Sequence, residues 1–274
     1  TERKENPLDF ALWKAAKEGE VSWDSPWGPG RPGWHIECSV MATEILGDTI
    51  DIHGGGADLE FPHHTNEIAQ SEAKTGKTFA NYWMHNGFVN VDNEKMSKSL
   101  GNFVTVHDML QTVDGQVLRF FLATQQYRKP INFTEKAIHD AEVNLKYLKN
   151  THSLPLTEQV NQAELQTYLD AFQEAMDDDF NTANGVTVLF DMAKWINSGN
   201  YDQTVKDAFE KMLQVFGIVF EEEVLDEDIE KLIEERQAAR ANKDFATADR
   251  IRDELAAQGI KLLDTKDGVR WTRD

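Results

Sequence analysis

The sequence predicts an α/β domain followed by an all-α region and a small α+β end, on three observations. Short apolar segments such as 50–56 alternate with helical segments early in the chain, which is typical of a parallel sheet covered by helices. After Gly115 the apolar spacing is helical throughout. The last apolar residues, 260–271, alternate around an Asp-Gly pair, which predicts a hairpin.

The first part of the chain predicts two helices separated by a loop. Asn6 as a cap and Pro7 at the first helical position predict a helix over 6–18. Residues 21–33 are rich in Pro and Gly and predict an irregular loop. A second helix is expected over 34–46. Its inward face would be formed by three apolar residues: Ile36, Val40 and Ile45.

The next segment predicts the elements that would hold a ligand. Residues 50–56 (IDIHGGG) predict a strand running into a glycine turn, 62–74 a helix, and 82–91 a further strand. A capping box at 105–108 predicts a helix start. Ligands of open α/β sheets bind at the carboxyl ends of strands, where both the glycine turn and the segment KMSKS (95–99) would lie.

The rest of the chain is predicted to be helical up to the final hairpin. The expected helices are 116–125, 134–150, 161–176, 182–197, 203–215, 226–242 and 245–258. A polar stretch at 149–160 predicts a domain boundary, and an acidic run around 221–235 predicts a second linker that enters a charged helix. The predicted domains are therefore a sheet-containing part, a connecting bridge, a helical bundle and a terminal subdomain: 1–115, 116–150, 151–225 and 226–274.

Composition limits the kind of protein this is. Asp and Glu number 48 against 28 Lys and Arg, a formal charge of −20, which disfavours a general nucleic-acid binder but allows a local basic face. The single cysteine rules out an internal disulfide and is typical of a reducing compartment. The sequence contains no apolar run long enough to span a membrane. We expect a cytoplasmic protein without membrane contact, and, since Thr1 is soon followed by a predicted helix, a missing amino-terminal part.

Three residues form a candidate metal site. His63 and Glu67 lie four apart in a predicted helix, so both project from one face, and Cys38 could reach them from the preceding helix. Thiolate, imidazole and carboxylate together suit zinc, and three ligands leave the site open. The alternative is a surface His–Glu pair beside a buried thiol.

Two further segments suit a nucleotide. In HGGGAD, Gly55 and Gly56 would let backbone approach a nucleotide closely, and Asp58 could accept hydrogen bonds from ribose; a structural tight turn is the alternative. In KMSKS, Lys95 and Lys98 with two serines could hold a triphosphate and stabilise the charge of departing pyrophosphate. A solvated basic loop is the alternative there.

The motifs together resemble the cysteinyl-tRNA synthetase family. KMSKS is a signature of class I aminoacyl-tRNA synthetases, and its combination with GWHIEC, DIHGGG and FPHHxNE resembles the cysteine-specific branch. Later segments, AMDDDFNT and RQAARANKDFATADRIRDEL, resemble that family's helical domains. The resemblance implies the second half of a Rossmann-like catalytic domain, a stem-contact bridge, a DALR-type bundle and an anticodon-binding end.

The resemblance also implies ligands and substrates. The family holds zinc with two cysteines, a histidine and a glutamate, of which Cys38, His63 and Glu67 match three. The other cysteine and the HxGH signature come from the first half of the catalytic domain and are not in this sequence, so we expect the chain alone to be inactive. The implied partners are L-cysteine, ATP with Mg²⁺, and tRNA(Cys), bound by a monomer.

Further residues take expected roles from the resemblance. Trp34 and His53 would wall the cysteine pocket, an ordinary core aromatic being the alternative for Trp34, and the backbone near Val89 would face the adenine. The bridge residues Arg119, Arg128 and Lys129 could meet phosphates. In the basic stretch 236–252, three residues would recognise anticodon bases, with an amphipathic helical hairpin as the alternative: Arg240, Phe245 and Asp249.

Two rival functions stay open from the sequence. One is the related ligase that joins cysteine to an amino sugar in mycothiol synthesis, against which residues 226–274 argue because that reaction needs no anticodon-reading end. The other is a non-catalytic zinc and RNA-binding module derived from a synthetase. The KMSKS segment argues against that module, because binding without catalysis does not require it.

Overall fold

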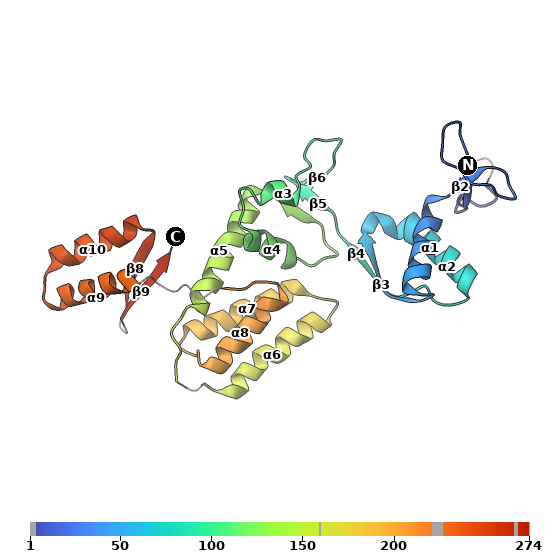
Figure 1. The fold of residues 1–274 in the computed structure, drawn as a ribbon. Coiled ribbons are helices and arrows are strands. Elements are labelled where there is room, and N and C mark those ends of the chain that lie inside the picture. Colours follow the sequence, from blue (N-terminus) through green and yellow to red (C-terminus); the bar gives the residue numbers. More distant parts are fainter. Residues whose placement is uncertain (1–3, 159, 221–226, 266–267, 274) are drawn as a thin grey trace. The chain divides into compact units, whose positions relative to one another are not determined.

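The computed structural model describes residues 4–158, 160–220, 227–265 and 268–273 (Figure 1). The chain divides into two compact units, Thr1–Val219 and Phe220–Asp274. An α/β part followed by helices and a small α+β end is the predicted fold class, and the order of elements confirms it. No helix in the described ranges has the length and apolar character needed to cross a membrane.

The amino-terminal segment forms a small antiparallel ribbon, so the helix predicted over 6–18 is wrong. Strand β1 (Trp13–Ala15) pairs with β2 (Gly30–Pro32). Asn6 makes a turn instead of capping a helix, since its side-chain oxygen accepts a hydrogen bond from the Leu8 amide at 2.9 Å. Pairing between segments distant in sequence thus overrides the local helix signal.

Helix α1 (Trp34–Leu46) forms where it was predicted, but its buried face differs from the prediction. Val40 is 44% exposed and Ile45 76% exposed, whereas Ser39 and Thr43 are buried. The reason is a polar contact with the neighbouring helix: the Ser39 hydroxyl donates to the Gln70 side-chain oxygen at 2.9 Å. The apolar residues were therefore a misleading guide to orientation in this helix.

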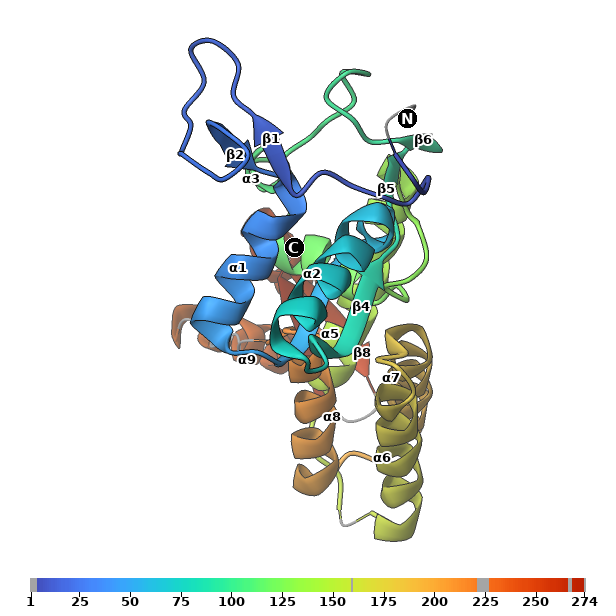
Figure 2. The same cartoon turned by 90° about the vertical axis from the view of Figure 1, so that its right-hand side faces the viewer.

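A two-stranded parallel sheet supports the candidate metal site. Strand β3 (Ile50–Gly56) pairs in parallel with β4 (Ala80–Asn86), joined by short turns η1 (Ala57–Leu59) and η2 (Glu60–His64) and by helix α2 (Thr65–Thr75). Figure 2 shows α1 and α2 side by side. A small core of Ile50, Phe79 and Ala80 packs against Ala42, Ile68 and Trp83.

The strand predicted over 82–91 is two strands in different sheets. After β4, strand β5 (Val89–Val91) pairs antiparallel with β6 (Glu94–Lys95) and in parallel with β7 (Ile131–Phe133). Strand β7 was not predicted from the sequence. Three helices accompany this sheet: α3 (Val106–Met109), α4 (Gly115–Ala123) and α5 (Glu135–His152). Thr105 caps α3, as predicted, by accepting from the Asp108 amide.

A helical bundle follows, and its boundaries confirm the prediction to within a residue or two. It contains α6 (Gln162–Asp177), α7 (Thr182–Asn197) and α8 (Gln203–Val215). Side-chain caps set the helix starts: Asn161, Asn181 and Asp202 each accept a hydrogen bond from an amide in the first turn. The largest side chains of its core are fully buried and include Leu189, Met192 and Phe209.

The second unit is a helical hairpin with a β-ribbon. Helices α9 (Glu227–Ala241) and α10 (Phe245–Ala257) precede the antiparallel strands β8 (Ile260–Thr265) and β9 (Gly268–Arg273). Ile229, Ile251, Leu255 and Ile260 form its core. The predicted helices and hairpin are confirmed, while part of the Asp-Gly turn lies outside the described residues.

Candidate metal centre and phosphate loop

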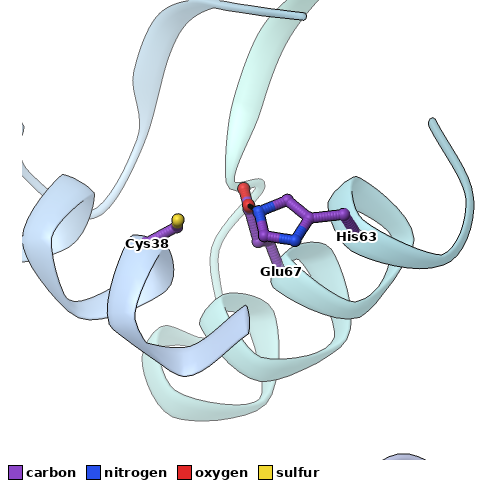
Figure 3. Close-up of side chains that lie close together, drawn as sticks. All are labelled: Cys38, His63 and Glu67. Carbon is purple, nitrogen blue, oxygen red and sulfur yellow. Dashed lines mark ion pairs between the residues drawn. The ribbon is translucent and has the colours of Figure 1, made fainter. Parts of the chain in front are cut away.

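The three predicted metal ligands come together from two helical segments. His63 lies in the turn η2 that leads into α2, Glu67 lies four residues later on α2, and Cys38 points toward them from α1 (Figure 3). One ligand atom from each residue falls within 4.8 Å of the others. His63 and Glu67 are buried and Cys38 is partly buried. A single cation could therefore contact sulfur, nitrogen and oxygen at once.

A second histidine orients His63. Nδ1 of His35 lies 2.8 Å from Nδ1 of His63, so the two rings share a hydrogen bond at those atoms. Nε2 of His63 is then directed to Glu67, 2.6 Å from Oε1. A hydrogen bond to the far ring nitrogen is the usual way in which a metal-binding histidine is held. His35 was not predicted as part of the site, although it lies three residues before Cys38, on the same face of α1.

Glu67 is the most buried of the three ligands and the most constrained. Its side chain is 1% exposed, and Oε2 lies 2.5 Å from Nε2 of His53. Oε1 is buried without a hydrogen-bond partner among the described residues, despite its closeness to His63. A buried carboxylate oxygen left unsatisfied is costly, and a bound cation would satisfy it. The arrangement fits a metal at this point.

The donor set and its electrostatics suit zinc. Burial is the main cause that raises the pKa of the Cys38 thiol, and the nearby negative charges of Glu67 and Glu37 raise it further. A bound divalent cation reverses this effect, because a metal ion stabilises the thiolate that coordinates it. Sulfur, imidazole nitrogen and carboxylate oxygen are all zinc ligands, and three protein ligands leave one position open.

A second histidine set shares Glu67 with the first. One ligand atom each of His53, His64 and Glu67 also lies within 4.8 Å of the others. His64 bonds through Nδ1 to Nε2 of His85 at 2.8 Å, and the Trp83 ring stacks on His53 with centroids 4.7 Å apart. Burial lowers the pKa of His64, so that its ring is favoured in the neutral form. His53 holds the Glu67 carboxylate directly, and His64 lies beside them both.

The two residues expected to wall the cysteine pocket both contact this centre. Trp34 begins α1, is largely exposed, and meets the His63 ring edge-on with centroids 5.4 Å apart. His53 lies on β3 and is held by Glu67 and Trp83. Trp34 is therefore a solvent-exposed neighbour of His63, and His53 is a partly buried neighbour of Glu67.

The glycines expected to approach a nucleotide have close neighbours within the protein. A Cβ on Gly55 would come 2.8 Å from Cε1 of His64, and one on Gly56 would come 2.5 Å from Oδ1 of Asp58. At Gly55 a side chain would clash with the His64 ring, so this position requires glycine, whereas the atom close to Gly56 is the end of the flexible Asp58 side chain, which can move aside. The tight-turn alternative considered for this segment thus has direct structural support, and the Asp58 carboxylate folds back over its own turn.

Lys95 is the last residue of β6, and Lys98 lies in the loop that follows the β5–β6 hairpin. Asp92 and Asn93 turn the hairpin with positive φ angles of 48° and 69°. The loop is closed by Asn102, whose side-chain oxygen accepts from the Ser97 amide at 2.8 Å. Lys95 Nζ lies 3.9 Å from the centroid of the Phe88 ring. Lys98 is exposed, and Val89, opposite Ile131, is also partly open to solvent.

The residues expected to recognise an anticodon surround the α9–α10 turn of the second unit. Phe245 begins α10 and is 63% exposed. Arg240 Nη1 lies 2.5 Å from Oδ1 of Asp264. The Asp264 carboxylate also accepts hydrogen bonds from Nη1 and Nη2 of the buried Arg236. Asp249 pairs with Arg252 at 3.2 Å. The sequence did not indicate Asp264, because it lies on β8, far from the basic stretch.

Comparisons with protein families divide the chain into three matched regions. Residues 1–143 match the catalytic domain of class I (C) tRNA synthetases. Residues 171–221 match the DALR domain, and residues 222–271 match the anticodon-binding domain of cysteinyl-tRNA ligase. The three matches together cover most of the chain.

Curated relatives match the whole chain at high identity. A "Cysteine--tRNA ligase" from Streptococcus thermophilus is 95% identical over 274 residues, and one from Streptococcus pyogenes is 86% identical. The chain spans 61% of the length of each. A Campylobacter jejuni structure provisionally described as an arginyl tRNA synthetase aligns with a TM-score of 0.53 at 14% identity, over 78% of this chain and 59% of that one. That last likeness concerns the fold.

Proposed function

This chain belongs to the cysteine branch of the class I tRNA synthetases, and from that premise we propose that it is part of a cysteine–tRNA ligase. The whole enzyme would join the carboxylate of L-cysteine to the α-phosphate of ATP, releasing pyrophosphate with Mg²⁺. It would then transfer the cysteinyl group to the terminal ribose of tRNA(Cys), releasing AMP. We further propose a monomer acting in the cytoplasm.

The observation that supports this proposal most directly is the convergence of Cys38, His63 and Glu67. Serine and cysteine differ by one atom, so a pocket that reads shape alone separates them poorly. Bound zinc would favour a thiolate sulfur strongly over a neutral hydroxyl, which supplies the missing discrimination. His35 and His53 would hold the two ligands in place, and Trp34 would limit the open side.

The remaining site residues take positioning and charge-stabilising roles in the proposal. Lys98, with Lys95, would stabilise negative charge on the departing pyrophosphate. Adenosine would lie along Gly55 and Gly56, with Asp58 toward the ribose and the backbone of Val89 toward the base. Bases of tRNA(Cys) would be recognised in the second unit by Arg240, Phe245 and Asp249. We propose that the chain alone does not form the adenylate, because the relatives extend well beyond it.

Zinc content tests the metal part of the proposal. The purified chain, dialysed against zinc, should retain about one equivalent by elemental analysis. The C38S variant should lose most of it, whereas S99A, an exposed change in another segment, should not. Equal zinc content in the chain and in C38S would refute the assignment of Cys38.

Cysteine-dependent ATP–pyrophosphate exchange tests the catalytic part in the full-length ligase containing this sequence. K98A should slow exchange about a hundredfold while zinc content stays unchanged, the size expected when a charge-stabilising donor is removed. K77A is a matched control, because Lys77 is an exposed lysine paired with Asp48. Unchanged exchange in K98A would contradict the role of Lys98.

A further inference from the structure

The turn between α6 and α7 has a strained backbone. Asp179 and Phe180 are consecutive non-glycine residues with positive φ angles of 53° and 51°. Residues other than glycine rarely adopt a positive φ angle, and two such residues in succession keep it only when other contacts hold the turn. The proposed roles of the metal site and the KMSKS loop do not explain this strain.

The contacts that hold the turn come from a distant segment. The Tyr127 hydroxyl donates to Oδ1 of Asp179 at 2.7 Å, and Nε of Arg128 donates to Oδ2 at 2.6 Å, across 52 and 51 residues. The Thr182 hydroxyl adds a bond to the Gln125 carbonyl at 2.9 Å. The Arg128 guanidinium, followed by the Tyr127 hydroxyl, lowers the pKa of Asp179. One carboxylate thus joins the helical bundle to the loop before β7.

The segment before β7 is also hydrogen-bonded to residues 87 and 88, which lead into β5. The Gly87 amide donates to the Tyr127 carbonyl at 2.7 Å, and the Ile131 amide donates to the Phe88 carbonyl at 2.8 Å. A Cβ on Gly87 would come 2.3 Å from the Lys129 carbonyl carbon, so the two backbones approach as closely as glycine permits. Tyr127 therefore contacts Asp179 through its side chain and Gly87 through its backbone.

Strand β5 in turn supports the lysines of KMSKS. Asn90 pairs with Lys95 across the hairpin, and the Met96 amide donates to the Val89 carbonyl at 3.1 Å. The loop therefore begins within a few ångströms of the strand that Tyr127 supports. A continuous series of hydrogen bonds leads from Asp179 to this loop.

We propose that Asp179 is a positioning residue that holds the 125–131 segment against β5 and thereby fixes the KMSKS loop for adenylate formation. This inference rests on the proposed function for its catalytic consequence. Its structural part stands on the contacts alone. Arg128, expected from the resemblance to meet tRNA phosphates, forms an ion pair with Asp179 through Nε.

The substitution D179N weakens the contacts of the Asp179 carboxylate with Tyr127 and Arg128 without changing the backbone conformation of the turn. Asparagine tolerates the left-handed conformation as aspartate does, so the turn is retained while the charge on the acceptor is lost. D178N is a matched control, because Asp178 is the preceding exposed residue of the same acidic run. Y127F is a second variant that removes one donor and leaves the Asp179 backbone untouched.

Hydrogen exchange of the 274-residue chain tests the structural part. The Gly87 and Ile131 amides should exchange about threefold faster in D179N and in Y127F, since an exposed ion pair or hydrogen bond gives a modest effect. They should be unchanged in D178N, and the buried amides of α7 should stay protected in every variant. Unchanged exchange at Gly87 and Ile131 in D179N would overturn the proposal.

Kinetics of the full-length ligase test the catalytic consequence. In D179N the kcat of cysteine-dependent ATP–pyrophosphate exchange should fall about tenfold, with KM for cysteine and zinc content unchanged. A fall no larger than that in D178N would overturn the proposal. Lack of exchange in the unaltered ligase would instead refute the proposed function, and hydrogen exchange of the chain would then alone decide whether Asp179 positions β5.

Discussion

Nε2 of His53 lies 2.5 Å from Oε2 of Glu67, although the two residues are fourteen positions apart in the chain. The contact fixes the carboxylate whose other oxygen faces His63 and whose neighbour is the Cys38 thiol. The sequence suggested His53 only as a wall of the cysteine pocket. In the structure His53 also holds the carboxylate of Glu67, a proposed metal ligand. Removing His53 should therefore reduce metal affinity directly, whether or not a substrate is bound.

Replacing His53 should weaken zinc binding without removing a ligand of the Cys38 set. We expect H53A to lower zinc affinity about 10- to 100-fold, the usual effect of deleting a residue that orients a metal ligand. Competition with a chromophoric chelator on the purified chain measures this. H107A is the control, because His107 is exposed on α3.

The same titration distinguishes the two histidine sets that share Glu67. If H53A abolished zinc binding while C38S had no effect, the cation would sit on His53, His64 and Glu67 instead. Equal affinity in H53A and the unaltered chain would contradict the supporting role of His53.

Phe245 should contribute to RNA binding through its ring. It is largely exposed at the start of α10, where a splayed base can stack on it. We expect F245A to weaken binding of a tRNA(Cys) anticodon hairpin to this chain about tenfold, and F245W to restore it, because stacking contributes roughly 1–3 kcal/mol per base. Fluorescence anisotropy measures this, with L263A, an exposed apolar change in the same unit, as the control. Equal affinity of F245A and L263A would refute the stacking role.

The pair of Arg236 with Asp264 should make the second unit sensitive to acid. Hydrogen bonds from Arg236 are the main cause that lowers the pKa of Asp264, and Arg236 is buried. A carboxylate with a lowered pKa stabilises the fold above its unfolded pKa of about 3.9, and this stabilisation is lost as pH falls through the folded pKa.

The variant D264N should show this loss already at pH 7. We expect it to destabilise the second unit by about 1 kcal/mol, a value reduced because Asp264 is 42% exposed. Hydrogen exchange of α9 and α10 amides in the full chain reports it at pH 7 and near pH 3. E254Q, which alters a surface pair with Arg250 in the same unit, is the control. If D264N and the unaltered chain differed equally at both pH values, Asp264 would not be the titrating group.

Local signals made most helices predictable. Asn161, Asn181 and Asp202 cap their helices through their own side chains, so sequence and structure agree there. Long-range contacts account for the failures. Residues 13–15 form a strand because they pair with residues 30–32, and the local sequence around residues 13–15 does not predict that pairing.

The candidate site divides in the same way. His63 and Glu67 were predictable because helical spacing places them on one face, and Cys38 because it lies in the preceding predicted helix, from which its thiol could reach them. The contacts of His35 with His63 and of His64 with His85 join residues 28 and 21 positions apart. Only the folded chain brings such pairs together, so the network that orients the ligands could not be derived from spacing.

Tyr201 should be a main support of the helical bundle. It is 1% exposed, and its hydroxyl donates to the His152 carbonyl at 2.8 Å. Removing that hydroxyl from a buried site should cost about 1–3 kcal/mol, so we expect Y201F to lower the free energy of unfolding by that amount. Urea titration of the chain measures it, with Y82F, an exposed tyrosine, as the control.

The pH dependence of Tyr201 gives this prediction a second readout. Burial, followed by the negative charge of Glu210, raises the pKa of Tyr201 well above its ordinary value. A group whose folded pKa is raised stabilises the fold below its unfolded pKa, here about 10, and that stabilisation is lost as pH rises further. The unaltered chain should therefore lose more stability than Y201F between pH 9 and 11. Equal losses would show that the Tyr201 hydroxyl is not held in its protonated form by the fold.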